Sequence, residues 1–553
     1  MTAETAAKTN NIGRIIGLSA LSGLLLTGAL PALDWGWLAW IALIPFLSLF
    51  PFRSKRAAFG GGMLLAGFYS LGMVYWVAVF AAHLIGPALS VLGWALLTLC
   101  EAAFFGAWAA GVQWLHGRSV WAWRLGVPAL WAVTEWARQS GPLGLSWGDL
   151  AYTQHLALPV LQVVKLAGIW GLAFLIVLVN LALLDVFRRR RKPGAFSLGT
   201  AALTAGAIAY GLLALRAENL RPTFVAAALQ GNIDQTASRN PEQDPAYTAR
   251  VMQTFTQQSR LAAEHGAALV VWPEEAFPGH LLDNPTPRQQ LALQARRDHQ
   301  VAVVGGAEYD WNLHKNANSL FLMDSTGTIT GSYQKRQLVP FGEFVPGSDW
   351  FPSLEALHVL PIHMKAGLET QPLLDGGPNI GKLGAAICFE SSYPRFLREQ
   401  AARGAGLLVI STDDVLFGQT SEVRQHSAIA AVRAAETDRY VVRSAATGIS
   451  QIVDPTGRVV AEAEQGKEVV VLAPVESRQT LTPFVRWGDW FIGLCILILA
   501  GVSIKKSPPR SCGEGLQGEG LQTGEAAVSL DSQLLFAGGN SRAANTEREQ
   551  QTE

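Results

Sequence analysis

The chain has 553 residues, of which 50% are hydrophobic and 16% are charged, and its formal net charge is +0. A chain of this length exceeds one ordinary domain, and the balanced charge argues against a protein that binds nucleic acid. The apolar content also excludes an ordinary soluble protein as a description of the whole chain.

Long apolar segments are concentrated in the first 215 residues. A transmembrane helix needs roughly 20 apolar residues to cross the hydrocarbon core of a bilayer. By this measure the sequence predicts a membrane bundle of about eight helices, near residues 12–32, 35–52, 57–80, 86–115, 120–138, 157–187, 197–215 and 484–504. We therefore expect a transmembrane domain at 1–219 and a final transmembrane helix at 483–506.

Basic residues between the predicted spans indicate how the chain is oriented. Lys and Arg accumulate in cytoplasmic loops, so the residues at 53–56, the run Arg188–Lys192 and the pair Lys505–Lys506 predict a cytoplasmic N-terminus. Residues 220–482 then face outward from the cytoplasm. Residues 507–553 have too little apolar content to fold alone, and we expect a disordered cytoplasmic tail there.

Residues 220–482 have the pattern of an α/β domain. Short runs rich in Val, Leu, Ile and Ala, such as 224–230, 267–271, 301–307 and 406–410, alternate with polar segments that favour helices. Polar groups follow several of these strands, at Glu274, at Cys388 and at Asp413–Asp414. Because α/β sheets usually keep their chemistry at strand ends, these positions are candidates for a site.

Cys388 is a candidate nucleophile. The predicted strand Leu383–Ile387 stops abruptly at this cysteine, and a helix is predicted soon after, at Arg395–Arg403. Such a bend holds a side chain at the carboxyl end of a sheet. Most free cysteines are core residues, but this is the one cysteine of four in the outward domain. A lone thiol in an oxidising compartment is more typical of chemistry than of structure.

Glu274 and Lys335 could supply what a reactive thiol needs. A carboxylate can take the thiol proton, and an ammonium group can stabilise both the thiolate and an oxyanion. With Cys388, these residues form a minimal set for acyl transfer through a thioester. The spacing alone leaves open an exposed glutamate, an exposed lysine and a core cysteine.

Three blocks of sequence resemble the nitrilase superfamily: Trp272–Ala276, Tyr333–Pro346 and Ile387–Pro394. The segment Leu-Val-Pro-Phe-Gly-Glu in the second block resembles the membrane branch of that superfamily, the apolipoprotein N-acyltransferases. Further similar blocks are Gly148–Gln154, Gln230–Ile233, Gln425–His426 and Thr447–Arg458. The resemblance runs from about residue 12 to residue 504, and it implies an α-β-β-α sandwich, a nitrilase-like fold, for residues 220–482.

The resemblance also implies roles for individual residues. Glu274 is the expected general base, Lys335 the cation beside the oxyanion and Cys388 the nucleophile. Glu343 and Glu390 are expected to support these three residues by holding Lys335.

The same resemblance implies substrates and a location. The expected acyl donor is a phospholipid, typically phosphatidylethanolamine, and the expected acceptor is the α-amino group of the diacylglyceryl-cysteine at the N-terminus of a lipoprotein. The expected location is the bacterial inner membrane, with the catalytic domain in the periplasm.

Several residues depart from the family pattern. Phe389 follows the cysteine where the family usually has tyrosine, and Asp413–Gly418 replaces the sequence Asn-Asp-Ala-Trp-Phe-Gly. We expect these departures to affect lipid or lipoprotein selection rather than the reaction class. His426 is interpreted as structural, because it lies on a helix that looks amphipathic.

Two alternative functions share the same sequence features. One is a membrane-tethered nitrilase-type amidase that releases its product to water. The other is a membrane bundle in which a degenerate nitrilase fold only binds a ligand, although a binding domain has no need of Glu274, Lys335 and Cys388 together. The sequence has no phosphate-binding loop and no cysteine–histidine cluster with metal-ligand spacing, so no cofactor is expected.

Overall fold

The computed structural model describes residues 12–504, except for residues 142, 191, 234–243 and 348–363. The chain divides into two units, residues 1–507 and residues 508–553. The following description concerns the first unit. The disordered tail predicted for 507–553 lies outside the described residues.

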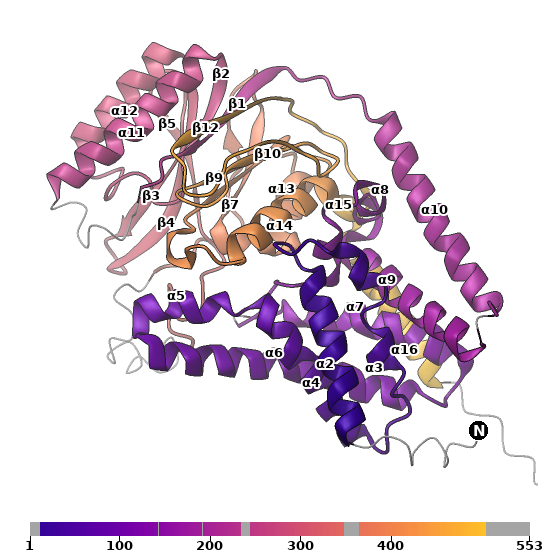
Figure 1. The fold of residues 1–553 in the computed structure, drawn as a ribbon. Helices are drawn as coiled ribbons and strands as arrows, with labels where there is room; N and C mark the ends of the chain where they lie inside the picture. Colours follow the sequence, from indigo (N-terminus) through magenta and orange to yellow (C-terminus); the bar gives the residue numbers. More distant parts are fainter. Residues whose placement is uncertain (1–11, 142, 191, 234–243, 348–363, 505–553) are drawn as a thin grey trace, which may run out of the picture. The chain divides into compact units, whose positions relative to one another are not determined.

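The described chain is helical from residue 12 to residue 217 and again at its end (Figure 1). In chain order they are α2 (Ile12–Ala29), η1 (Gly36–Trp40), α3 (Ile44–Leu47), α4 (Lys55–Met73), α5 (Trp76–Ile85), α6 (Pro87–Leu115), η2 (Ala122–Gly126), α7 (Val127–Arg138), η3 (Leu150–Gln154), α8 (Leu158–Leu161), α9 (Val164–Arg188), α10 (Ala195–Ala217), α15 (Pro483–Trp487) and α16 (Trp490–Ile504).

The prediction of about eight membrane spans is only partly confirmed. In the described part of the chain, four helices are long and apolar enough to cross a bilayer: α2, α6, α9 and α10. The pair α4 and α5 adds a fifth if a helix bent by 68° is one span. The predicted spans at 35–52, 120–138 and 484–504 instead form shorter helices.

Local sequence explains two of these shorter helices. Pro45 and Pro51 lie within the second predicted span, and proline interrupts regular helical hydrogen bonding. In the last predicted span, Gly488 has a φ of 61° and separates α15 from α16. Hydropathy measures composition over a window, so it does not register such breaks.

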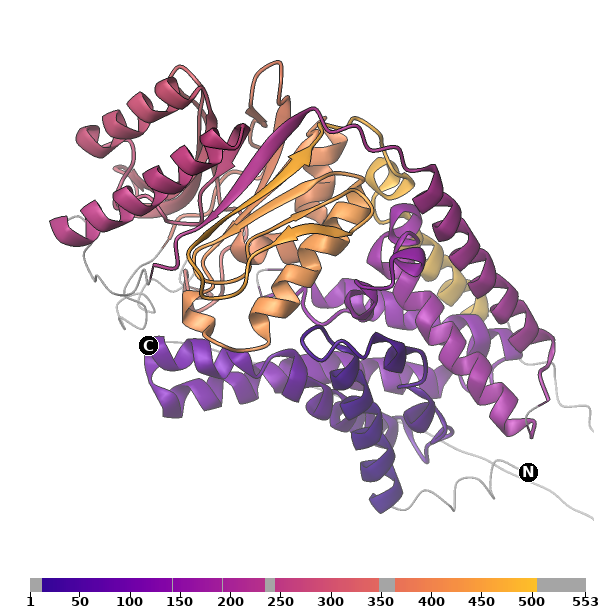
Figure 2. The ribbon, with the colours of Figure 1, turned by 45° about the horizontal axis from the view of Figure 1, so that its top comes forward.

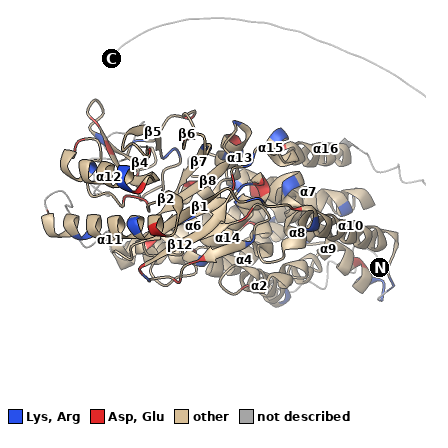
Figure 3. Cartoon of the chain, turned by 90° about the horizontal axis from the view of Figure 1, so that it is seen from above, with Lys and Arg blue, Asp and Glu red and all other residues tan. Residues whose placement is uncertain are grey.

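Large apolar side chains are exposed along two of the long helices. On α6 and α10 these include Leu89, Leu92, Leu96, Leu99, Leu198, Leu203 and Leu213. The α10 sequence contains one charged residue, Arg216, and the helix is almost uniformly tan in Figure 3. Apolar faces of this extent are typical of surfaces that contact lipid.

The described residues of the domain that follows form twelve strands in two six-stranded sheets. The strands are β1 (Phe224–Gln230), β2 (Ala267–Val271), β3 (Val301–Asp310), β4 (Lys315–Met323), β5 (Ile329–Gln334), β6 (Leu374–Asp375), β7 (Lys382–Ile387), β8 (Leu407–Thr412), β9 (Val441–Ala445), β10 (Gln451–Val453), β11 (Val459–Glu462) and β12 (Val469–Val475). Their orders are β12-β1-β2-β3-β4-β5 and β11-β10-β9-β8-β7-β6. The strands β1–β2–β3 and β7–β8–β9 are parallel.

Alternating side chains bind the two sheets into one sandwich. Residues on one face of each sheet, such as Leu269 and Val409, form the core between the sheets. On the outer faces, Val270 packs toward α11 (Pro245–Glu264) and α12 (Pro285–Asp298). The outer face of the second sheet packs toward α13 (Pro394–Ala402) and α14 (Glu422–Thr437), as Figure 2 shows. The predicted α-β-β-α arrangement is confirmed.

The layer formed by α13 and α14 also contacts the membrane helices. Phe396, Ile429 and Val432 share a hydrophobic core with residues of the N-terminal helices. Lys165 of α9 forms an ion pair with Asp438, with an Nζ–Oδ1 distance of 2.8 Å. The sheet end that carries Cys388 therefore lies close to the membrane bundle.

Candidate active site

Cys388 lies at a strained bend between β7 and α13. It is the first residue of the short helix η7 (Cys388–Ser392), and its φ is 49°. A positive φ is uncommon for a residue other than glycine and is often found at functional sites. Because β7 is flanked by a parallel strand, β8, the thiol lies at the carboxyl end of the sheet, as the sequence predicted.

Glu274 follows β2 and is held by three hydrogen bonds. Its Oε1 accepts from the Asn318 side-chain nitrogen at 2.6 Å and from Lys335 Nζ at 3.1 Å, and its Oε2 accepts from the Asp413 backbone nitrogen at 2.7 Å. A side chain at Gly305 would clash here, because a Cβ would lie 2.0 Å from the Pro273 carbonyl oxygen. Glycine in β3 thus allows the turn that carries Glu274 to approach the sheet.

Lys335 follows β5 and is almost completely buried, with 1% of its surface exposed. Its Nζ lies 3.1 Å from Glu274 and 2.6 Å from Glu343 Oε1. Glu343 is itself held, since its Oε2 accepts from the Val339 backbone nitrogen at 2.8 Å. Burial by itself lowers the pKa of Lys335, but the carboxylates of Glu274 and Glu343 outweigh it and raise that pKa well above its usual range. The lysine is therefore a permanent cation.

The Cys388 thiol is neutral at rest. Cys388 is partly buried. This burial raises the pKa of the thiol well above its usual range, and the charge of Glu274 raises it further, while Lys335 opposes both effects. The sulfur therefore needs a base when it attacks, and Glu274 is the carboxylate whose charge it senses most strongly.

Glu390 supports the site through the backbone. Its carboxylate accepts from the backbone nitrogens of Arg336 at 2.7 Å and Ile387 at 2.9 Å, and from the Tyr333 hydroxyl at 3.0 Å. Among the described residues, Lys335 forms ion pairs with Glu274 and Glu343. Glu343 contacts Lys335 directly, as expected. Glu390 differs from the expectation, because its hydrogen bonds join the chain segments beside Lys335 and Cys388.

Comparison with known proteins identifies the family. Residues 22–182 match the apolipoprotein N-acyltransferase N-terminal domain, and residues 225–482 match the carbon-nitrogen hydrolase family. An apolipoprotein N-acyltransferase of Geobacter metallireducens is 30% identical over 491 residues, which cover 87% of this chain and 92% of that protein. The chain belongs to the apolipoprotein N-acyltransferase family.

A second relative agrees with this membership. An apolipoprotein N-acyltransferase of Gloeobacter violaceus is 31% identical over 535 residues, which cover 91% of this chain and 96% of that protein. Among solved structures, an amidase from Nesterenkonia sp. aligns with a TM-score of 0.35 and 18% identity, over 47% of this chain and 94% of the amidase.

Asn318 was missed by the sequence analysis of this apolipoprotein N-acyltransferase family member. It lies in β4, is 1% exposed, and donates from its side chain to Glu274. Its backbone oxygen also accepts from the Lys335 backbone nitrogen at 2.9 Å. The available signal was an asparagine beside the apolar run 319–323, because a buried polar side chain requires a partner.

Asp413 is partly buried beside Glu274. Burial and the neighbouring charge of Glu274 raise the pKa of the Asp413 carboxyl group well above its usual range. This shift favours the protonated, uncharged form of the carboxyl group. Its Oδ1 accepts from the Val415 backbone nitrogen at 3.0 Å.

A second buried polar cluster lies behind the cysteine. Asp414, Glu422 and His426 are placed closely enough to offer three ligands to a metal ion. However, a guanidinium nitrogen of Arg443 lies 2.9 Å from Asp414 Oδ2 and already supplies a positive charge there. We therefore interpret the cluster as a network of ion pairs.

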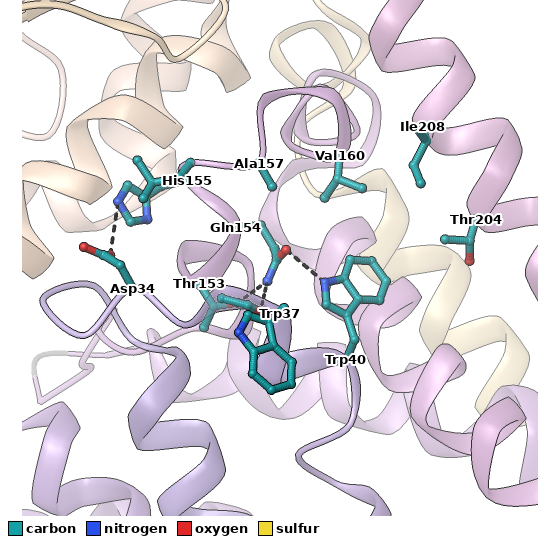
Figure 4. A pocket seen from close by; sticks show the side chains of 12 residues that line it. Asp34, Trp37, Trp40, Thr153, Gln154, His155, Ala157, Val160, Thr204 and Ile208 are labelled. Carbon is teal, nitrogen blue, oxygen red and sulfur yellow. Dashed lines mark hydrogen bonds and ion pairs between the residues drawn. The ribbon is translucent and has the colours of Figure 1, made fainter.

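A separate cavity of about 470 Å³ lies at the side of the helical region (Figure 4). Its walls come from η1, η3, α8 and α10, whereas the candidate triad lies on the sandwich domain. Within it, the indole of Trp40 donates to Gln154 at 2.9 Å, and His155 lies 3.6 Å from Asp34. This cavity is distinct from the site around Cys388.

Proposed function

We propose that this chain transfers an acyl chain from a phospholipid, through a thioester on Cys388, to the α-amino group of a lipoprotein's N-terminal diacylglyceryl-cysteine. The proposal rests on one observation. The ammonium group of Lys335 is buried between Glu274 and Glu343, next to a neutral thiol at a strained bend. This combination supplies a base, a cation and a nucleophile for acyl transfer.

In the first half-reaction, Glu274 takes the proton from the Cys388 thiol while the sulfur attacks an ester carbonyl carbon of the phospholipid. The new C–S bond converts the carbonyl oxygen into an oxyanion, which the ammonium group of Lys335 stabilises. The bond from this carbon to the glycerol oxygen then breaks, and the leaving oxygen takes the proton from Glu274. The lysophospholipid leaves, and the acyl chain remains as a thioester.

In the second half-reaction, the neutral α-amine of the lipoprotein attacks the thioester carbonyl. Glu274 accepts a proton from the amine, the C–S bond breaks, and the proton returns to the departing sulfur of Cys388. An amide bond has formed and the enzyme is restored. Because one sulfur holds one acyl group, the two half-reactions occur in sequence.

The packing of the bend supports a lipid substrate over a soluble one. Phe389 and Tyr393, which follow the nucleophile, belong to the hydrophobic core that includes the membrane helices. The Tyr393 hydroxyl also donates to the Gly144 carbonyl oxygen in the loop before η3. A soluble amidase has no need of such an attachment, so this observation favours a substrate that lies in the membrane.

The proposal includes the donor, the domain roles and the location. Phosphatidylethanolamine is the proposed donor. Residues 1–219 and 483–506 anchor the chain in the bacterial inner membrane, and residues 220–482 catalyse the reaction on the periplasmic side. In support, Arg188 donates to the Leu47 and Phe50 carbonyl oxygens and Arg118 to the Ser503 carbonyl oxygen. Basic residues thus lie near the ends of several helices, as expected of a cytoplasmic face.

An acceptor assay tests the proposed function. Purified full-length protein is incubated with phosphatidylethanolamine, with or without a diacylated lipopeptide that has a free α-amine, and the products are identified by mass spectrometry. We expect an acylated Cys388 peptide without the acceptor, and an N-acylated lipopeptide with it. Release of free fatty acid at the same rate with and without the lipopeptide would instead establish the amidase-type hydrolase.

A further inference from the structure

The imidazole of His426 contacts the backbone of the candidate nucleophile. His426 lies on α14, and its Nε2 is 3.2 Å from the Cys388 carbonyl oxygen and 2.8 Å from Ser391 Oγ. The Ser391 hydroxyl donates to the same carbonyl oxygen at 2.8 Å. Two polar side chains, one from another helix, therefore converge on one carbonyl group at the strained bend.

The opposite edge of the ring determines where the proton is. Nδ1 lies 3.2 Å from an Arg443 nitrogen, 3.4 Å from Glu422 and 3.6 Å from Asp414. A guanidinium group can only donate, so a neutral ring that accepts from Arg443 at Nδ1 carries its proton on Nε2. In an imidazolium both nitrogens carry protons. Nε2 is a donor in both of these states.

The carbonyl group of Cys388 is a point at which the bend can be held. With a φ of 49°, this residue is in a conformation that costs free energy and persists only when its surroundings enforce it. His426 is 1% exposed, so water does not compete for its hydrogen bonds. The buried carboxylates of Asp414 and Glu422, together with Arg443, fix the plane of the ring.

We propose that His426 is a positioning residue, which holds the Cys388 bend by donating from Nε2 to the Cys388 carbonyl oxygen and to Ser391. Loss of this donor lets the bend relax toward an ordinary φ and moves the sulfur away from Glu274 and Lys335. The effect on turnover rests on the proposed function, whereas the effect on the thiol can be measured independently of it.

Four substitutions separate positioning from a general structural role. His426→Gln places an amide nitrogen near the position of Nε2 and keeps the donor. His426→Asn places its amide nitrogen nearer to Nδ1, and His426→Phe removes both nitrogens while keeping a ring. Ser391→Ala removes the second donor to the same carbonyl oxygen. His265→Asn, at the exposed end of α11, is the matched control.

The first measurement is the rate of thioester formation by the purified full-length protein with phosphatidylethanolamine. Loss of a hydrogen bond to a buried polar group should slow His426→Asn and His426→Phe roughly 10- to 100-fold in kcat, and Ser391→Ala roughly threefold. KM for the phospholipid should not change, because the ring contacts the nucleophile's backbone rather than the lipid. His426→Gln should stay within roughly threefold of the wild type.

The second measurement is the pH dependence of Cys388 alkylation by iodoacetamide, read on the Cys388 peptide by mass spectrometry. The wild type and His426→Gln should react only at high pH, because the thiol is held beside Glu274 in a buried position. In His426→Asn and His426→Phe the relaxed thiol should react at lower pH, nearer to the behaviour of a free cysteine. His265→Asn should match the wild type in both measurements.

Equal kcat values and equal alkylation curves for His426→Asn and His426→Gln would overturn the proposal. If His426→Phe does not fold, the comparison of His426→Asn with His426→Gln decides the matter. If the wild type forms no acyl adduct, the proposed function fails, and the alkylation curves still test the positioning role.

Discussion

The indole nitrogen of Trp147 donates a 2.6 Å hydrogen bond to the side-chain oxygen of Gln425. The same oxygen accepts from the indole of Trp76 at 3.3 Å, and the Gln425 amide nitrogen donates to the Gly72 carbonyl oxygen at 2.9 Å. Gln425 precedes His426 on α14. One glutamine therefore joins α14 to the bend between α4 and α5 and to the loop before η3.

Trp147 is itself fixed from the membrane side. Its carbonyl oxygen accepts from Arg138 at 2.7 Å, and Arg138 forms a buried ion pair with Glu101 at 2.6 Å. A charged residue inside a predicted span thus pairs with a charge from a neighbouring helix. Together these contacts form a continuous polar connection from α6 to α14.

Replacing Gln425 with leucine should weaken the attachment of the sandwich to the helices. The change leaves the Trp147 and Trp76 indoles and the Gly72 carbonyl group without this partner, and each buried unpaired group costs about 1–3 kcal/mol. We expect a destabilisation of about 2–4 kcal/mol, measured by thermal unfolding in detergent. Gln465→Leu removes a glutamine whose hydrogen bond to the Gly418 carbonyl oxygen is exposed to solvent, and as the control it should change stability by less than about 0.5 kcal/mol. Equal unfolding temperatures for the two variants would contradict the attachment.

Glu343→Gln should slow the first half-reaction while leaving the protein folded. When the charge of Glu343 is removed, Lys335 pairs more strongly with Glu274, and Glu274 becomes a weaker base. Loss of a charge-assisted hydrogen bond predicts a rate of thioester formation that is roughly 10- to 100-fold lower. Glu369→Gln removes a carboxylate that is 92% exposed and pairs with Arg336, and it should change the rate less than about twofold. If both variants slow the reaction equally, Lys335 is not controlled by Glu343.

The pH dependence of Cys388 alkylation should move in opposite directions in two variants. Thiolate is the reactive form, and a raised pKa keeps Cys388 protonated until high pH. Because Glu274 raises this pKa and Lys335 lowers it, Glu274→Gln should move the curve to lower pH and Lys335→Met to higher pH, each by about one unit or more. The exposed Glu264→Gln serves as the control and should not move the curve.

The same Glu274→Gln variant should lose thioester formation even though its thiol ionises more easily. Nothing then protonates the leaving glycerol oxygen, so attack does not lead to product. Normal thioester formation in Glu274→Gln would show that the base is another group. This pair of results separates the charge of Glu274 from its function in proton transfer.

The sequence predicted those residues of the site whose neighbours along the chain carry a recognisable pattern. Glu274 and Cys388 follow apolar strands, and strand ends of a parallel sheet meet, so their proximity could be expected. Glu343 is only eight residues from Lys335. Gln425 and Trp147 are 278 residues apart, and no local pattern connects them. The contact depends on how α14 packs against the bundle.

The number of spans was less predictable for a different reason. Hydropathy reports the apolar content of a window, whereas a span requires a continuous helix. Gly488, with its positive φ, and Pro45 interrupt segments of suitable composition. The long helices α6 and α10 have no such interruption, and the kink of α9 at Ala167–Gly168 lies near its start, so the sequence predicted these three helices well.

The last prediction concerns the side of the membrane on which the catalytic domain lies. The helix α10 has 23 residues, which corresponds to about 35 Å and exceeds the roughly 30 Å of a hydrocarbon core. Only 11% of its apolar 18-residue segment is buried in the protein, as expected for a helix surrounded by lipid. The basic run that ends α9 lies before α10, and β1 of the sandwich follows it. A single crossing should therefore separate the two ends of α10.

Alkaline phosphatase, which is active only outside the cytoplasm, can measure this separation in a bacterial host. A fusion after Arg221 should be active, and a fusion after Arg190 should be inactive, because basic loops remain in the cytoplasm. A third fusion after Lys55 should also be inactive, since it lies in another basic loop. Equal activity of the Arg190 and Arg221 fusions would mean that α10 does not cross, and Cys388 would then face the same compartment as the basic run.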